Sequence, residues 1–480
     1  MELTAIGMVQ IVFGLMIVLL GSSNSAFLFL IFSSLLEGSA AILLPALGGS
    51  SIPPAQFALV FVLLRIAAPR GGTYGHFPDA IRANAWLLLF CFYGIAMAVI
   101  GPRLFGGRIS VFPMRPILNA GVFEVFPLAP TAQNLTAGSY MLGTILVALA
   151  AYVLARSKGG AALVSATIWG GWFFIVSGVL DLVGRGTPLE DALAIFRNGD
   201  YVQMSVEVDG FVRIRGFMPE ASTYAGACFV FLVASVELWY RNIRPGQTGL
   251  LAIALVAILV MSTSSTAYVS IAFYVAFFLF RALAIPVLVP RGKMKRLLAV
   301  LLTGAVFVAI AMALVPQVLE AISDLILSMT VGKSTSFSGQ QRLFWAMQGV
   351  HAFWSSYGLG IGPGSFRSSS MATAILGSMG AIGIGSFLLY LRAVLQPSRR
   401  STWGLGQDID QTLGGAFACT AVFSLIPALV GSPQANPATA FSVFAGAALA
   451  LRTAQQSRPT RDQFQRSDAP GPAASAAQSA

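Results

Sequence analysis

The stretch ASTYAGACFVFLVASVELWY, Ala221 to Tyr240, indicates the fold class of this chain of 480 residues. It contains one charged residue, Glu237, and a helix of this length crosses the hydrocarbon core of a bilayer. Similar runs recur along the sequence, which is 56% hydrophobic and only 10% charged. Such a composition excludes a soluble domain with a polar surface and predicts a polytopic membrane protein.

The apolar runs predict about 13 membrane spans, within a range of 12 to 14, if a span needs about 17 to 25 residues. They fall near 3–21, 25–47, 54–68, 85–102, 137–155, 161–183, 221–240, 247–264, 266–285, 297–315, 371–392, 412–431 and 436–451. The transmembrane domain is therefore expected to cover 1–451. The first run lacks a basic leader and a cleavage site, so we interpret it as a retained span. The segment 452–480 is rich in Ala, Ser, Pro and Gln and predicts a disordered cytoplasmic tail.

Most of the 29 Lys and Arg residues fall in short segments on one side of these spans, for example in RGKMKR, Arg291 to Arg296. Because basic short loops stay in the cytoplasm, that side is expected to be cytoplasmic. The net charge of +11 is then a topology signal with some affinity for anionic membrane lipids, and no nucleic-acid partner is expected. Three longer segments, about 103–136, 184–220 and 316–370, are placed outside.

Cysteines and acidic residues offer little for a metal or redox site. Cys91, Cys228 and Cys419 all lie in apolar runs, and there is no HExxH motif or Cys and His cluster, so neither a metal nor another cofactor is expected.

Among the charged residues within the predicted spans, Glu37 is the costliest, because an ionised residue near a helix centre costs about 2.5 to 3.5 kcal/mol. Asp181 and Glu237 lie nearer to span ends, where they are expected to reach water.

The external stretch VRIRGFMPE, Val212 to Glu220, brings two arginines and a glutamate to the edge of the membrane. Pro219 and Glu220 are expected in the first turn of the following helix, where proline fits and the helix dipole favours a carboxylate. The simplest interpretation is that Arg213 and Arg215 contact lipid headgroups. A binding site for an anionic substrate is the alternative.

A second external stretch, STSFSGQQRLFWAMQGVHAFW, runs from Ser334 to Trp354. Its SGQQ sequence, which begins at Ser338, fits a capping box and predicts the start of a helix. Arg342 then lies in the first turn, where backbone N–H groups and the dipole favour an anion. The alternative is an interfacial helix anchored by Trp345 and Trp354, with His351 packed on its apolar face.

The stretch YGLGIGPGSFRSSS, Tyr357 to Ser370, has four glycines and a proline between Gly358 and Gly364. Glycine permits a positive φ and a close approach of the backbone to a ligand, although a re-entrant turn would use the same residues. The stretch lacks the Gly-Lys-Ser ending of a nucleotide-binding loop.

The order of these motifs resembles the O-antigen ligase and Wzy-type polysaccharide polymerase superfamily, in the form seen in exopolysaccharide polymerases. The resemblance covers about 205–395. It rests on RGFMPEAS (Arg215 to Ser222), TSSTAYVSIAF (Thr263 to Phe273), Arg342-x-x-Trp345 and GLGIGPGSF (Gly358 to Phe366). The N-terminal half matches as a set of spans, with PLAPTAQNLTAGSY, Pro127 to Tyr140, similar to an external segment of such polymerases.

This resemblance implies an all-α, GT-C-like membrane glycosyltransferase that has external loop helices and needs no metal. It would work as a polysaccharide polymerase on the periplasmic face of the bacterial inner membrane. The glycan would pass from a polyprenyl-pyrophosphate carrier to a sugar hydroxyl of another lipid-linked repeat unit. The implied partners are the polyprenyl-pyrophosphate-linked oligosaccharide, membrane lipids and other polysaccharide export proteins.

The resemblance assigns Arg215 and Arg342 to the pyrophosphate, which suits the planar guanidinium fork. It assigns Glu220 to the acceptor, as the base or as an orienting group. The expected substrate-binding residues are Arg213, Gln341, Trp345, His351, Gly362 and Arg367.

Two considerations bear on the alternative functions. Ligases of the superfamily commonly carry a His after the glycine-rich turn, whereas this chain reads RSSSMATAIL from Arg367 to Leu376. A ligase-like transferase to a lipid or protein acceptor nevertheless remains an alternative. A lipid-linked oligosaccharide transporter is expected to place charges along its spans at the midplane, and a scaffold would not depend on Arg342.

Overall fold

The computed structural model describes residues 1–45, 50–68, 73–115, 117, 121, 123–198, 207–208, 211–284, 293, 295, 299, 337–406 and 408–453. Nearly all of the expected span 297–315, the first third of the external segment 316–370 and nearly all of the predicted tail lie outside these residues.

Seven helical segments of the described chain are long and apolar enough to cross a membrane. They are α5 (Ala85–Leu104), α6 (Ala132–Leu154) with the turn that follows it, α7 (Gly160–Val183), α9 (Ala221–Tyr240), α11 (Ser265–Ala284), α16 (Met371–Leu395), and α18 (Ile409–Phe423) together with α19 (Ile426–Gly431). Five shorter apolar helices fall at five further predicted spans: α1 (Ala5–Leu20), α2 (Ser23–Ser34), α3 (Pro54–Ala67), α10 (Pro245–Met261) and α20 (Thr439–Thr453). The described chain is thus a helical, multi-pass membrane protein, while the total of 12 to 14 spans stays a prediction.

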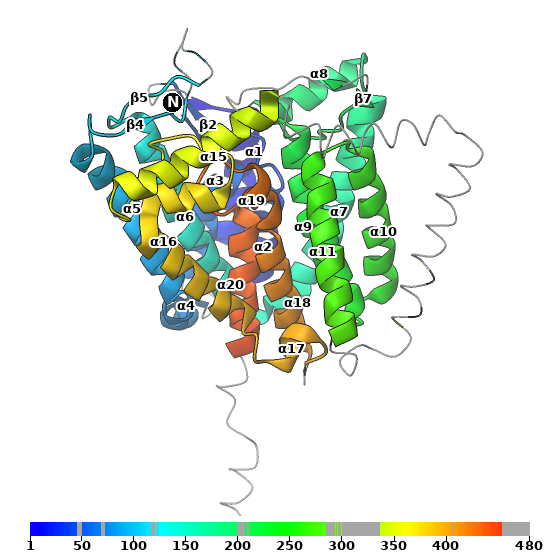
Figure 1. Cartoon of the computed structure of the whole chain (residues 1–480). Helices are drawn as coiled ribbons and strands as arrows, with labels where there is room; N and C mark the ends of the chain where they lie inside the picture. The colour runs from blue at the N-terminus through cyan, green and yellow to red at the C-terminus, as the bar shows by residue number, and fades with distance from the viewer. Residues whose placement is uncertain are drawn as a thin grey trace, which may run out of the picture.

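The remaining elements are short and lie at the two ends of the bundle (Figure 1). At one end lie α8 (Pro188–Ala194), α15 (Phe337–Ser355) and three small antiparallel sheets, and we call this the α15 end. The sheets are β1 (Glu2–Leu3), β2 (Ile42–Leu44) and β3 (Ser50–Ile52), then β4 (Ser110–Val111) with β5 (Phe126–Pro127), and β6 (Glu207–Val208) with β7 (Phe211–Val212). At the other, the α17 end, lie α4 (Phe77–Ala83) and α17 (Arg400–Trp403). The described parts of all three predicted external segments therefore share one end.

The distribution of buried and exposed side chains is the one expected for a helical bundle in lipid. The central helices α6, α9, α18 and α20 are mostly buried, and small residues let them approach closely. A Cβ at Gly446 of α20 would lie 2.3 Å from the Ala148 carbonyl oxygen of α6. The outer helices α1, α5, α10 and α11 expose large apolar side chains such as Phe13 and Phe280, which a bilayer would cover.

The prediction of a span over 25–47 is wrong in its second half. Helix α2 ends at Ser34, and β2 then pairs with β3. Contacts distant in sequence stop the helix: the backbone N–H of Ala40 donates to Asn198, and the Ser39 hydroxyl donates to the Phe196 carbonyl. Glu37 therefore lies in a turn at the α15 end and not at a helix centre.

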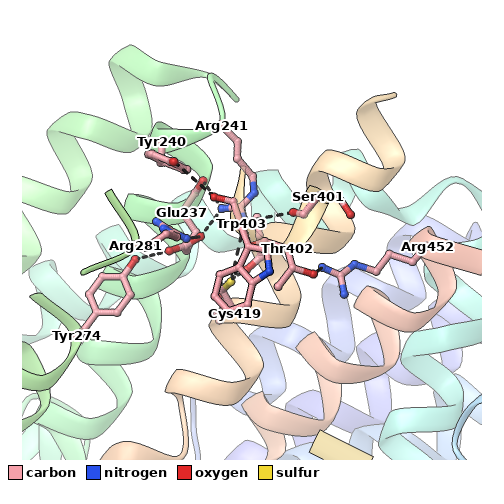
Figure 2. A network of polar contacts seen from close by, with 12 residues as sticks. Glu237, Tyr240, Arg241, Tyr274, Arg281, Ser401, Thr402, Trp403, Cys419 and Arg452 are labelled. Carbon is pink, nitrogen blue, oxygen red and sulfur yellow. Dashed lines mark hydrogen bonds and ion pairs between the residues drawn. The ribbon is translucent and has the colours of Figure 1, made fainter. Parts of the chain in front are cut away.

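A buried charge network joins five helices at the α17 end (Figure 2). The Glu237 carboxylate of α9 pairs with Arg241 of the same helix and with Arg281 of α11 at 2.9 Å, and the Tyr274 hydroxyl donates to it at 2.7 Å. The prediction that Glu237 reaches water is wrong, because its side chain is fully buried. Since Glu237 and Arg281 sit near the ends of α9 and α11, the network lies at an end of the bundle rather than at its middle.

Three further helices, α17, α20 and α16, attach to this network. Arg241 donates to the Thr402 carbonyl of α17 at 2.8 Å, and Arg452 of α20 donates to the Thr402 hydroxyl at 3.0 Å (Figure 2). Arg452 also donates to the Val394 and Leu395 carbonyls at the end of α16. These arginines satisfy helix-end carbonyls that would otherwise lack partners in a dry environment.

We expect Glu237→Ala to lower the free energy of unfolding by about 3 to 5 kcal/mol, because it leaves Arg241 and Arg281 buried without a counter-charge. Thermal unfolding of the detergent-solubilised protein measures this. The control is Asp79→Ala, which breaks an exposed ion pair with Arg82 and should cost no more than about 1 kcal/mol. Equal losses in the two variants would contradict a structural role for the network.

Candidate functional site

Asp181, near the end of α7, fixes the segment that carries Arg213 and Arg215. Its carboxylate pairs with Arg197 and accepts the backbone N–H of Arg215 at 2.9 Å. The Arg197 Nε also donates to the Gly216 carbonyl at 3.0 Å, and Arg185 donates to the Arg213 carbonyl at 2.6 Å. The prediction that Asp181 reaches water is wrong, because these arginines enclose it and leave it 4% exposed.

The Arg215 side chain takes part in the same cluster. Its Nε lies 4.0 Å from Asp181 and one of its terminal nitrogens lies 3.7 Å from Glu190 of α8. Burial lowers the pKa of Arg215 and the charge of Arg197 adds to this, while Asp181 and Glu190 raise it. Arg215, which the resemblance assigned to the pyrophosphate, is therefore already engaged by protein carboxylates.

Arg213 lies in a different electrostatic environment, beside Glu220 and Arg342. Burial lowers the pKa of Arg213, the charge of Glu220 raises it, and the charge of Arg342 lowers it. Burial likewise lowers the pKa of Arg367, which Glu220 raises. The charge of Glu220 thus acts on Arg213 and on Arg367, and the charge of Arg342 acts on Arg213; we call these four residues, which come from three separate segments, the Arg–Glu group.

Glu220 marks the start of α9 but does not cap it through its side chain. The helix begins at Ala221, one residue later, so the prediction that Pro219 and Glu220 form its first turn is wrong by one or two positions. The Glu220 carboxylate accepts a hydrogen bond from the Ser222 hydroxyl at 3.1 Å and makes no cap to a backbone N–H. It therefore keeps capacity for further hydrogen bonds.

The predicted helix is confirmed as α15, which spans Phe337–Ser355, but Ser338 already lies inside it, so the predicted cap at Ser338 and the first-turn position of Arg342 are wrong. Arg342 lies in its second turn, and its carbonyl accepts the Ser369 hydroxyl at 2.6 Å. Trp345 is 9% exposed and packs against Phe112, so its predicted role as an interfacial anchor is wrong. The Arg367 guanidinium lies 4.5 Å from the centre of its ring, a cation–π contact that orients this arginine.

Gln341 and His351 are the other expected binding residues on α15. Gln341 is half-buried and precedes Arg342 directly. His351 is exposed, and nine residues after Arg342 correspond to two and a half turns, so it lies on the opposite side of the helix. The packed position predicted for His351 is wrong, and this residue does not join the Arg–Glu group.

The glycine-rich stretch packs against protein. Gly362 has φ +95°, and a Cβ there would lie 2.3 Å from the Met97 carbonyl oxygen of α5. The backbone N–H groups of Ile361 and Gly362 donate to the Gly377 and Ser378 carbonyls of α16 at 2.9 Å each. Gly362 therefore has a packing role as a re-entrant turn residue, and the turn delivers Arg367 to the site.

A cavity of about 280 Å³ lies near Glu220, although none of the four residues of the Arg–Glu group lines it. Ser222, the partner of Glu220, lines it, and so does Pro433, whose carbonyl accepts the N–H of Ser368. Most of the lining is apolar and comes from α2, α7, α9, α19 and α20; it includes Ile31, Leu163, Phe174, Val230, Phe231 and Phe444. Glu37 is the one ionisable side chain among the described lining residues.

We expect Gly362→Ala to unfold at a lower temperature than the wild type, because the new Cβ meets the Met97 carbonyl and the positive φ costs about 1 to 2 kcal/mol more. The matched control is Gly385→Ala in α16, where a Cβ meets nothing within 4 Å. Thermal unfolding of both purified variants provides the measurement. A Gly362→Ala protein as stable as the control would favour a ligand-binding role for this glycine.

The described residues contain no group of three His, Cys, Asp or Glu side chains placed to hold a metal ion. Comparison with family models and with curated proteins finds no match to this chain. The function is therefore argued from the residues of the site.

Proposed function

We propose that this chain is a polysaccharide polymerase, a metal-independent glycosyltransferase of the GT-C type in the bacterial inner membrane. It would take a glycan from a polyprenyl-pyrophosphate carrier and join it to a lipid-linked repeat unit at the periplasmic face. The observation that supports this most strongly is the Arg–Glu group: Arg213 and Arg367 lie in the field of Glu220, Arg342 acts on Arg213, and an apolar cavity lies near Glu220.

The charge of the group suits a pyrophosphate. Arg213, Arg342 and Arg367 outnumber Glu220, so the site has an excess of positive charge. Each guanidinium can donate two parallel hydrogen bonds to phosphate oxygens. Partial burial strengthens these interactions, and they would stabilise the charge that develops on the leaving group as the glycosidic bond breaks.

The bond changes follow from this arrangement. An acceptor hydroxyl oxygen forms a bond to the anomeric carbon, and its proton passes to a base. The bond between the anomeric carbon and the phosphate oxygen breaks, and its electron pair leaves with the lipid pyrophosphate. Glu220 faces the arginines and is hydrogen bonded to Ser222, a position from which it can hold the acceptor as a base or as an orienting group.

The two arginines of VRIR then have different roles. Arg213 contacts the pyrophosphate, whereas Arg215 holds the segment in place through Asp181 and Glu190. This division modifies the role that the resemblance gave to Arg215, and it follows from the partners of each side chain.

Other observations favour a transferase over the alternatives. In the described spans the Glu237 network lies at the α17 end, away from the midplane where a transporter would need its charges. The sequence Arg367 to Leu376 has no His, and His351 lies on the far side of α15, so a ligase mechanism with a histidine base has no candidate near the group.

We expect Arg213→Ala, Arg342→Ala and Arg367→Ala each to lower polymerisation about 100-fold to 1,000-fold, as for loss of one donor to a developing anion. The size distribution of lipid-linked and released glycans, measured in cells that lack the protein and are complemented with each variant, should shift from long chains to single repeat units. Arg108→Ala, at an exposed arginine of the same end, is the control and should restore long chains.

The same assay separates the alternatives. Long chains that form but remain on the carrier would identify a ligase, and units that stay on the cytoplasmic face would identify a transporter. Arg215→Ala is expected to reduce the amount of folded protein, because it removes a partner of buried Asp181. If the Arg215→Ala protein that does fold makes glycan chains of normal length, the result would support the division of roles between Arg213 and Arg215.

A further inference from the structure

Glu37 is a half-buried carboxyl that has no counter-charge among the described residues. It lies in the turn after α2, and its side chain lines the cavity near Glu220. By contrast, the buried carboxylates Asp181 and Glu237 each pair with two or more arginines. No Lys or Arg of the described residues forms an ion pair with Glu37.

The hydrogen bonds that the described chain makes to the Glu37 carboxyl come from one residue, Thr439. Its Oε1 accepts the backbone N–H of Thr439 at 3.1 Å, at the start of α20. Burial raises the pKa of Glu37, and the hydrogen bonds from Thr439 lower it by less. A carboxyl in an apolar wall without a cation favours a proton or a hydroxyl as its partner. The elements around the cavity add no second ionisable side chain to the described lining.

Glu37 also lies against the segment that carries the site. A Cβ at the neighbouring Gly38 would lie 2.8 Å from the Pro219 ring and 2.9 Å from the Phe217 carbonyl oxygen. Met218 and Ser222, which flank Glu220, line the same cavity as Glu37. The turn after α2 and the RGFMPE segment therefore form adjoining walls of one site.

Building on the proposed function, we propose that Glu37 is the catalytic base, which receives the proton of the acceptor hydroxyl while the arginines receive the pyrophosphate. The acceptor oxygen bonds to the anomeric carbon as its proton moves to the Glu37 carboxylate. The pyrophosphate leaves with the electron pair of the broken bond, and Glu37 then returns its proton to water.

The surroundings favour Glu37 over Glu220 for this step. Glu220 lies in the field of Arg213 and Arg367 and is hydrogen bonded to Ser222, which favours a role in orienting the acceptor and the arginines. Glu37 has no cation beside it in the described chain, and an isolated carboxyl in an apolar site is a better proton acceptor near neutral pH.

The test uses the full-length protein in proteoliposomes with a lipid-linked repeat unit, and it compares Glu37→Gln, Glu37→Asp and Glu220→Gln. Glu37→Gln keeps the shape of the side chain and an oxygen for the Thr439 N–H. The matched control is Glu124→Gln, at an exposed glutamate of the α15 end. The measurements are the rate of chain extension against pH, protection from thermal unfolding by added pyrophosphate, and the melting temperature.

We expect Glu37→Gln to extend chains at least 100-fold more slowly, with unchanged pyrophosphate protection and melting temperature. The wild-type rate should fall as the pH drops through the raised pKa of Glu37, since a base must be deprotonated to act. That dependence should be absent from the residual rate of Glu37→Gln and partly retained in Glu37→Asp.

Each other outcome overturns the inference in a distinguishable way. If Glu37→Gln extends chains at the wild-type rate while Glu220→Gln does not, Glu220 is the base and the proposed function stands. If Glu37→Gln loses pyrophosphate protection or melts lower in proportion to its loss of rate, Glu37 has a structural role. If the wild-type protein extends no chain, the proposed function fails and the role of Glu37 in it fails as well.

Discussion

The pairing of Asp181 with Arg197 and with the backbone of Arg215 is the interaction on which the site depends. A buried carboxylate without partners would be costly, and it is stabilised by the cations and N–H groups around it. These partners belong to the chain between α7 and α9, so satisfying Asp181 also fixes the path of that chain. Arg213 and Glu220 lie on either side of the fixed portion, which is why they can face Arg342 and Arg367.

The bulk of the fold could be predicted from hydropathy, because a bilayer requires long apolar helices and leaves few alternatives. The helix α15 was also predictable from the pattern of its residues, although Ser338 lies inside it and not at the cap that SGQQ predicted. The end of α2 could not be predicted. The run after Ser34 is apolar enough to continue a helix, and it stops because Ser39 and Ala40 bond to residues near 197, far away in sequence.

Only part of the site was predictable, because contacts between segments distant in sequence decide which side chains meet. The sequence places Arg213, Arg342 and Arg367 in segments expected on one side, but the partner of each side chain depends on three-dimensional packing. Arg213 and Arg215 are two residues apart and look equivalent in the sequence, yet one faces Glu220 and the other faces Asp181. His351 shares a helix with Arg342 and lies on its opposite side, a difference that helical periodicity alone could have shown.

Two buried carboxylates and the half-buried Glu37 show that the cost of removing a carboxyl from water can be met in different ways. Glu237 is neutralised by arginines from two helices and ties the α17 end together, and Asp181 does the same for the chain before α9. Glu37 accepts hydrogen bonds from Thr439 at the start of α20 and otherwise lies in an apolar wall, with no Lys or Arg of the described residues paired to it. A carboxyl without an ion pair in the wall of a cavity is a candidate for chemistry with a bound ligand. Under the proposed function, the acceptor sugar would offer its hydroxyl to this carboxyl and the lipid pyrophosphate would offer its charge to the arginines.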